Sequence, residues 1–104
     1  MYQGRVKKDS LKDEGFLNFA TSLKDEGGIL VFEVEDEFAS SIIIEMSEEL
    51  RSGANFGVVK SEYQTNVVFP EKVFTFDKSN PEEREKMIKY GGSLSISPKE
   101  LETL

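Results

Sequence analysis

Residues 29–46 read ILVFEVEDEFASSIIIEM, and this stretch decides how the rest of the chain is expected to fold. Two runs rich in β-branched and aromatic residues, 29–35 and 40–46, flank a short acidic segment, and such runs are typical of β-strands. The segment between them is short enough for a hairpin turn. Pairing Glu35 with Ala39 separates an apolar face from an acidic face, whereas a shift of one residue mixes the two. The stretch therefore predicts an antiparallel hairpin. Its predicted core face holds Leu30, Phe32, Val34, Ile42 and Ile44, and its outer face holds Val31, Glu33, Glu35, Ile43 and Glu45.

A helix is expected before this hairpin, over residues 11–25. Ser10 is a suitable N-cap, and an apolar stripe with helical spacing follows it. Gly27 and Gly28 are expected to end the helix, since glycine is favoured just past a helix C-terminus. The stripe that we expect to pack on the sheet consists of Phe16, Phe19, Ala20 and Leu23.

A second helix is expected over residues 81–90. Asn80 supplies a capping side chain, Pro81 suits the first helical position, and acidic residues follow at the positive end of the helix dipole. Gly91 and Gly92 are expected to stop this helix. A further cap signature begins at Ser97, but few residues follow it, so the tail is expected to fray.

Four more segments read as extended chain. They are residues 2–8, residues 56–69 as one bent strand or a hairpin around 60–62, residues 72–76 and residues 93–96. Residues 1–104 are therefore expected to form a single α+β domain. We expect a mostly antiparallel sheet of five or six strands with both helices on one face.

Charge is distributed unevenly along the chain. The net charge is −7, yet residues 25–50 alone contain nine carboxylates and no Lys or Arg. A strong local field of one sign acts on partners rather than on the fold. We therefore expect the acidic hairpin either to recognise a basic partner or simply to solubilise the sheet and protect its edge. The candidate partner-binding residues are Glu33, Glu35, Asp36, Glu37, Phe38, Glu45, Glu48 and Glu49.

Two aromatic residues stand apart from the expected core. Phe38 lies in the acidic turn, and Phe56 follows a Gly-Ala-Asn segment. An aromatic side chain at a loop tip is typical of an interface anchor. Both residues are therefore candidates for contact with a partner, although loop aromatics also fold inward.

The basic N-terminal strand raises the alternative of nucleic-acid binding through Arg5, Lys7 and Lys8. Three charges are few, and the acidic segment would repel a phosphate backbone. We therefore expect no direct nucleic-acid binding, and pairing of these cations with the acidic hairpin is the plainer interpretation.

Several function classes are disfavoured by composition. The chain contains neither His nor Cys, so Ser-His and Cys-His nucleophiles and disulfides are excluded. No cofactor or metal motif occurs, and no apolar stretch approaches the length of a membrane span. A Cys-free chain fits the reducing cytoplasm.

The sequence thus favours a small cytoplasmic binding protein over an enzyme. Its expected partner is a basic protein, and the sharpest form of this hypothesis is an inhibitor that mimics nucleic acid, of the kind encoded by phages and mobile elements. The alternatives are an assembly protein that self-associates through a sheet edge, and a carboxylate-dependent metal enzyme.

Overall fold

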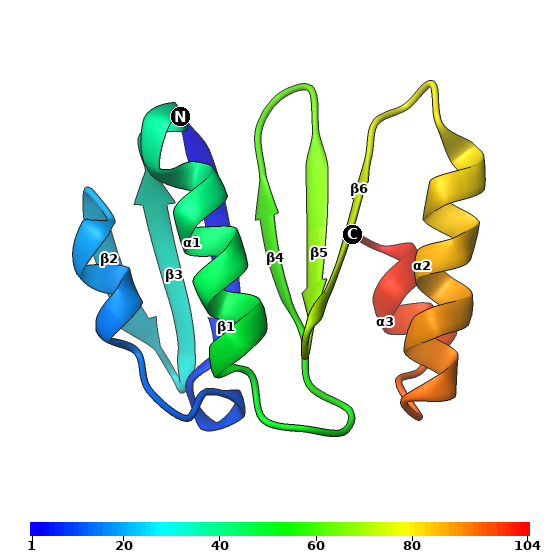
Figure 1. Cartoon of the computed structure of the whole chain (residues 1–104), viewed down its shortest axis with the longest axis horizontal. Coiled ribbons are helices and arrows are strands. Elements are labelled where there is room, and N and C mark those ends of the chain that lie inside the picture. Colours follow the sequence, from blue (N-terminus) through cyan, green and yellow to red (C-terminus); the bar gives the residue numbers. More distant parts are fainter.

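A computed structural model describes all residues from 1 to 104 and contains one six-stranded sheet with helices packed against it. The strands are β1 (Tyr2–Lys7), β2 (Ser22–Glu26), β3 (Ile29–Val34), β4 (Gly57–Lys60), β5 (Thr65–Phe69) and β6 (Lys72–Phe76). The α-helices are α1 (Asp36–Glu49), α2 (Pro81–Ser93) and α3 (Pro98–Glu102), and two 3₁₀ helices, η1 (Lys8–Ser10) and η2 (Gly15–Phe19), precede β2. The order across the sheet is β2-β3-β1-β4-β5-β6, and every neighbouring pair is antiparallel. The predicted α+β class and antiparallel sheet are confirmed (Figure 1).

The first strand of the chain lies inside the sheet, between β3 and β4 (Figure 1). Gly4 of β1 pairs with Phe32 of β3, and the ring of Phe32 occupies the space that a β-carbon on Gly4 would fill. A glycine is therefore required where the largest side chain of this core crosses the neighbouring strand.

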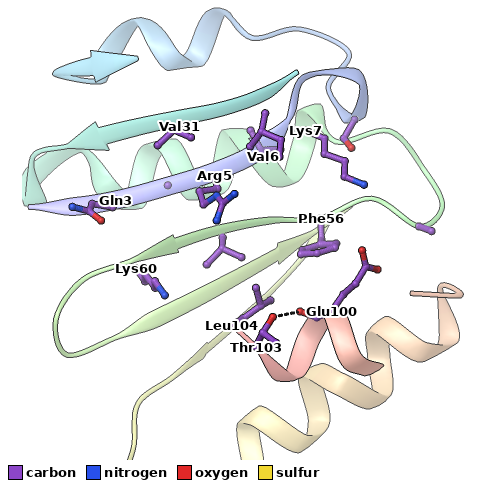
Figure 2. Close-up of a pocket in the computed structure, with 15 residues that line it drawn as sticks. Gln3, Arg5, Val6, Lys7, Val31, Phe56, Lys60, Glu100, Thr103 and Leu104 are labelled. Carbon is purple, nitrogen blue, oxygen red and sulfur yellow. Dashed lines mark hydrogen bonds between the residues drawn. The ribbon is translucent and has the colours of Figure 1, made fainter. Parts of the chain in front are cut away.

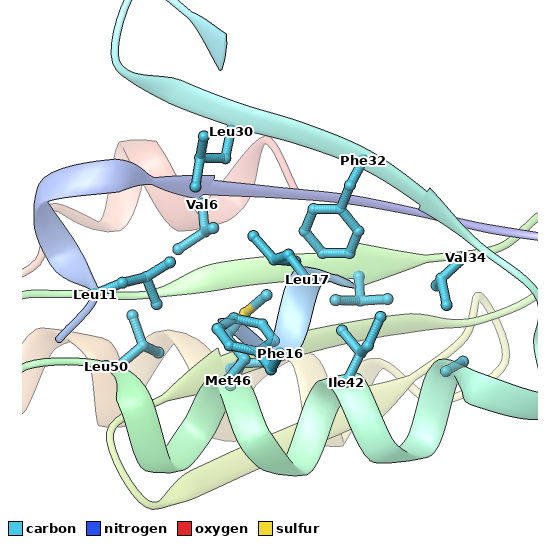
Figure 3. Close-up of a cluster of buried hydrophobic side chains, with 13 residues drawn as sticks. Val6, Leu11, Phe16, Leu17, Leu30, Phe32, Val34, Ile42, Met46 and Leu50 are labelled. Atoms are coloured by element: carbon cyan, nitrogen blue, oxygen red, sulfur yellow. The ribbon is translucent and has the colours of Figure 1, made fainter. Parts of the chain in front are cut away.

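The α1 helix covers one face of the sheet. Side chains from β1, β3, β4 and β5 point toward it and form a core with the helix and η2 (Figure 3). Ala39, Ile42 and Met46 of α1 are buried in this core, and Leu50 follows them one turn later. Their spacing of three and four residues places them on one helical stripe.

The other face is covered only at β5 and β6, by α2 and α3. Val67, Phe69 and Phe74 form a second core with Met87 of α2 and Leu101 of α3. Val68, which lies between Val67 and Phe69, belongs to the first core instead, because successive strand residues point to opposite faces. The two long helices therefore lie on opposite faces, whereas the sequence predicted them on one face. The physical reason is that β5 is buried on both sides and needs a cover on each.

The predicted hairpin of residues 29–46 is half correct. β3 forms where expected, but the second half is the helix α1, so Ile44 is not a core residue and is 56% exposed. Three consecutive isoleucines favour a strand by propensity. The helix forms instead because it buries Ala39, Ile42 and Met46 together in the core. Tertiary packing thus overrides local β-propensity here.

The predicted helix over residues 11–25 is wrong. The chain there forms a bridge at Leu11, the 3₁₀ helix η2 and the edge strand β2. Gly27 and Gly28 have φ values of 65° and 90° and make the two-residue turn of the β2–β3 hairpin rather than a helix cap. Because the stripe is not helical, Phe16 is buried while Phe19 and Leu23 are exposed.

The C-terminal part differs from prediction in several respects. α2 begins after Asn80 as predicted, although the Asn80 side chain makes no capping hydrogen bond, and it runs through both glycines to Ser93. The predicted strand at residues 93–96 does not form, and Leu94 and Ser95 make a turn instead. The predicted frayed tail is instead α3, whose N-cap Ser97 accepts a hydrogen bond from the backbone N–H of Lys99.

Just before the α2 helix, Ser79 donates its backbone N–H and its hydroxyl to Asp77, and these bonds lower the pKa of the Asp77 carboxyl.

Candidate functional site

A stacked pair of exposed phenylalanines marks one corner of the molecule. Phe19 comes from the end of η2 and Phe38 from the first turn of α1, and their ring centroids are 6.0 Å apart with an interplanar angle of 27°. The side chains are 55% and 39% exposed, respectively. Phe19 was predicted to be core, and Phe38 was predicted to be an interface anchor. We call this pair the aromatic corner.

Local structure holds the two rings at the surface. η2 packs beside α1, and its buried residues Phe16 and Leu17 anchor it in the first core. Asp13 accepts a hydrogen bond from the backbone N–H of Gly15 and thereby sets the turn that starts η2. Phe19 is left at the solvent side of this short helix, opposite Phe38.

Exposed apolar side chains also occur on β2, the strand that follows η2, and at the N-terminus. Leu23 of β2 is exposed and pairs with Phe32, so its side chain points to the same sheet face as α1. The Met1 side chain is exposed as well, and its sulfur accepts a weak hydrogen bond from the Thr21 hydroxyl. Exposed apolar side chains that gather at one place are a feature of interaction sites, whereas scattered ones are not.

Acidic residues surround this corner on the α1 side. Glu35 is the N-cap of α1, Asp36 and Glu37 form its first turn, and all three are exposed. Asp36 bonds to the Met1 amine, and this contact raises the pKa of that amine above its usual value. Neither Glu35 nor Glu37 is in an ion pair.

Two further acids lie on the same flank of α1 as Phe38. Glu45 and Glu49 follow Phe38 by seven and eleven residues, a spacing that keeps a helical flank over about three turns. Both are partly buried, and one carboxylate oxygen of Glu45 is shielded from solvent without any hydrogen-bond donor. Buried acceptors normally have a partner, so this oxygen is an unsatisfied group at the edge of the site.

The remaining two predicted residues lie elsewhere. Glu48 is on the outward ridge of α1 with Ile44, about three turns beyond Glu37 and the aromatic corner. Glu33 lies on the opposite face of the sheet, where it accepts a hydrogen bond from the hydroxyl of Ser22. The expectation that Glu33, Glu35 and Glu45 form one patch is therefore wrong, because Glu45 is helical and not on a paired strand.

The acidic residues make few contacts with cations of the chain. The structure contains three ion pairs: Met1–Asp36, Lys8–Asp25 at 3.6 Å and Lys86–Glu83 at 3.1 Å. Of the eight predicted partner-binding residues, Asp36 alone takes part in one. Of the three N-terminal cations predicted to pair with the acidic segment, Lys8 does so through Asp25, whereas Arg5 and Lys7 are in no ion pair.

Neither a metal centre nor a membrane span is evident in the structure. No group of three or more carboxylate side chains is arranged to hold a metal ion. None of the helices combines the length and apolar character that crossing a bilayer requires.

Comparison with protein-family models, with curated proteins and with solved structures finds no match to this chain.

Proposed function

We propose that this chain is a small binding protein that recognises a basic protein through the aromatic corner and the carboxylates around it. The observation that carries the proposal is the exposed stack of Phe19 on Phe38 beside Glu35 and Glu37. An aromatic pair held at the surface is costly to leave in water, and aromatic anchors dominate many interfaces.

The surrounding carboxylates would add steering and selectivity. Segment 25–50 has no Lys or Arg, so the field around α1 is not neutralised by its own sequence neighbours. Such a field raises the association rate with a cationic surface and is weakened by salt. In this proposal the aromatic corner anchors the partner, and the surrounding carboxylates select for a basic one.

The partner class that best suits this surface is a basic, nucleic-acid-binding protein with an apolar contact at its cationic site. Full mimicry of nucleic acid is less well supported, because Glu33 lies on the other sheet face and the remaining acids follow one helix. A Cys-free chain without His is consistent with a cytoplasmic binding role rather than catalysis.

Self-association is a second candidate, favoured by one observation. β2 is an edge strand, and all five of its residues are exposed. An open edge can pair with another strand, although the charged residues Lys24, Asp25 and Glu26 on β2 counteract this. Sedimentation equilibrium tests this alternative, since a defined oligomer that persists in high salt would favour it over the acidic docking surface.

The main test is capture with matched variants. The immobilised chain is exposed to lysate of its source cells at low and high salt, beside the variant Phe19→Ser/Phe38→Ser. The control is Tyr63→Ser, which removes an aromatic side chain that is 80% exposed in a turn away from the corner. We expect one basic protein to be retained at low salt by the wild type and by the control, and to be lost with the double variant.

A charge variant separates anchoring from steering. Glu35→Lys/Glu37→Lys should weaken capture at low salt, whereas Glu82→Lys/Glu85→Lys, on exposed positions of α2, should not. Retention of the same protein by the aromatic double variant would refute the proposed surface.

A further inference from the structure

A groove lies on the sheet face away from α1, where no long helix covers β1, β3 and β4. Its volume is about 340 Å³, within the range of small-molecule sites. Val31 of β3 and Val58 of β4 flank Arg5 on this face, and Phe56 from the loop before β4 and Leu104 from the end of the chain also line the groove (Figure 2). A wider hollow of about 610 Å³ beside α2 has one apolar residue, Ile88, in its lining, so it offers little for an apolar ligand.

Three cations line the groove. Arg5 and Lys7 alternate along β1 on this face, and Lys60 of β4 pairs with Gln3. Arg5 pairs with Val58, two residues before Lys60, so the two cationic side chains start about 7–8 Å apart. One anionic head group could contact both.

These cations lack partners within the chain. None of Arg5, Lys7 and Lys60 takes part in an ion pair, and none donates a side-chain hydrogen bond. Glu100 is the single acidic side chain in the lining, and it extends into the same groove without pairing with Lys7 (Figure 2). The groove is therefore locally cationic in a chain whose net charge is −7.

Seven of the fifteen residues that line the groove are apolar, and Gln3, Ser10 and Thr103 are uncharged polar residues. Ile29 and Val31 are only half-buried, Val58 of β4 is buried, and the ring centroid of Phe56 is 6.4 Å from that of Phe69. Leu104 closes the groove on the α3 side. Covering this surface would be favourable for a ligand with an apolar body.

The shape and charge exclude the larger occupants. β1, β3 and β4 each have a strand paired on both sides, so an extended peptide could not add to them by backbone hydrogen bonds. A polyanion such as nucleic acid would be repelled by the net negative charge of the chain. A small ligand with a single negative charge avoids both problems.

We propose that this groove binds an amphipathic organic carboxylate, with its carboxylate between Arg5 and Lys60 and its apolar body on Val31, Val58 and Phe56. The guanidinium of Arg5 matches a planar carboxylate through paired hydrogen bonds, and Lys60 adds a second charge. This ligand site is separate from the aromatic corner, which lies on the α1 side of the sheet.

The test is a ¹⁵N-NMR titration of the chain with decanoate. Matched probes are decanol, which has the body without the charge, and acetate, which has the charge without the body. We expect saturable shifts for decanoate at the amides of residues 3–7, 56–60 and 103–104. Decanol and acetate should each bind at least about tenfold more weakly, and tenfold corresponds to about 1.4 kcal/mol.

Charge variants complete the test. Arg5→Gln/Lys60→Gln should weaken decanoate binding by about tenfold or more, while Lys78→Gln/Lys89→Gln, which removes two exposed charges outside the groove, should change it less than twofold. All these side chains are exposed, so a preserved amide spectrum is expected for each variant. The proposal is overturned if decanol binds as well as decanoate, if both variant pairs behave alike, or if the shifts are diffuse. Shifts of the same amides on raising protein concentration alone would place a second copy of the chain in the groove and would also overturn it.

Discussion

The side chain of Leu101 in α3 occupies the space that a β-carbon on Gly91 in α2 would fill. Gly91 therefore allows Leu101 of α3 to pack against the α2 backbone, and it does not end the helix. Leu101 is fully buried in the second core, next to Phe69 and Met87. The short C-terminal helix α3 is thus held against α2 by Leu101, which packs where Gly91 has no side chain.

This contact predicts that Gly91→Ala lowers the free energy of unfolding when Leu101 is present but not when Leu101 has been replaced by alanine. Gly91→Ala should lower the free energy of unfolding by roughly 1–3 kcal/mol, because the new methyl group displaces Leu101. In a Leu101→Ala background, which itself should cost about 2–5 kcal/mol, Gly91→Ala should become neutral or stabilising, since alanine is the better helix former. Urea unfolding of the four proteins measures the cycle. Equal effects of Gly91→Ala in both backgrounds would show that Leu101 does not rest on Gly91.

The unsatisfied oxygen of Glu45 predicts a stabilising substitution. Glu45→Met keeps the helix and the approximate volume but removes a carboxylate oxygen that is shielded without a donor. The free energy of unfolding should rise by about 1 kcal/mol, while the exposed control Glu48→Met should change it by less than about 0.5 kcal/mol. Urea unfolding at neutral pH compares the two variants. A clear loss of stability for Glu45→Met would mean that the carboxylate is satisfied in solution.

The turn after α2 predicts a second stabilising substitution. Ser95 has a φ of 69°, and its backbone N–H and that of Ile96 donate to the carbonyls of Gly92 and Gly91 to close the helix. Glycine adopts this left-handed conformation without steric cost, so Ser95→Gly should raise stability by about 0.5–1 kcal/mol. The matched control is Ser93→Gly inside the helix, which should lower stability by a few tenths of a kcal/mol. Thermal unfolding would contradict the turn geometry if Ser95→Gly were the more destabilising of the two.

The aromatic corner predicts a small effect on stability. Phe19 and Phe38 keep much of their surface in water, so Phe19→Ser should cost about 1 kcal/mol or less, whereas Phe16→Ser, from the buried side of η2, should cost several times more. Urea unfolding distinguishes the two. A loss of more than about 3 kcal/mol for Phe19→Ser would return Phe19 to the core.

Local signals were sufficient for much of the sheet and for α2. β3 and β6 follow from alternation and β-propensity, and the start of α2 follows from Pro81 and the acidic residues after it. For residues 56–69 the sequence left a bent strand and a hairpin open, and the structure has the β4–β5 hairpin. These elements have local patterns that agree with their tertiary surroundings. The clustering of acidic residues around positions 35–49 was also evident from the sequence, and the structure leaves Phe38 partly exposed.

The errors have a common physical origin. Residues 42–44 are three isoleucines whose propensity favours a strand, and the need to cover the first core overrides that preference and gives α1. The stripe at residues 16–23 had helical spacing by coincidence, and Gly27-Gly28 between two extended runs was the hairpin signal that could have corrected it. The prediction that Phe19 is buried followed from this error, and no other feature of the sequence indicated that its side chain is exposed. Lys60 lies near Arg5 because of the register between β1 and β4, and the sequence did not determine that register.

The central claim is tested most directly by hydrogen–deuterium exchange of the chain with and without its captured basic partner. The proposed surface predicts added protection at Gly15–Phe19 and Asp36–Glu49, with no change along β1 and β4. Protection should fade as salt is added, because the carboxylates contribute through a screened field. Protection confined to β1 and β4, or to the edge strand β2, with η2 and α1 unchanged, would contradict recognition through the aromatic corner.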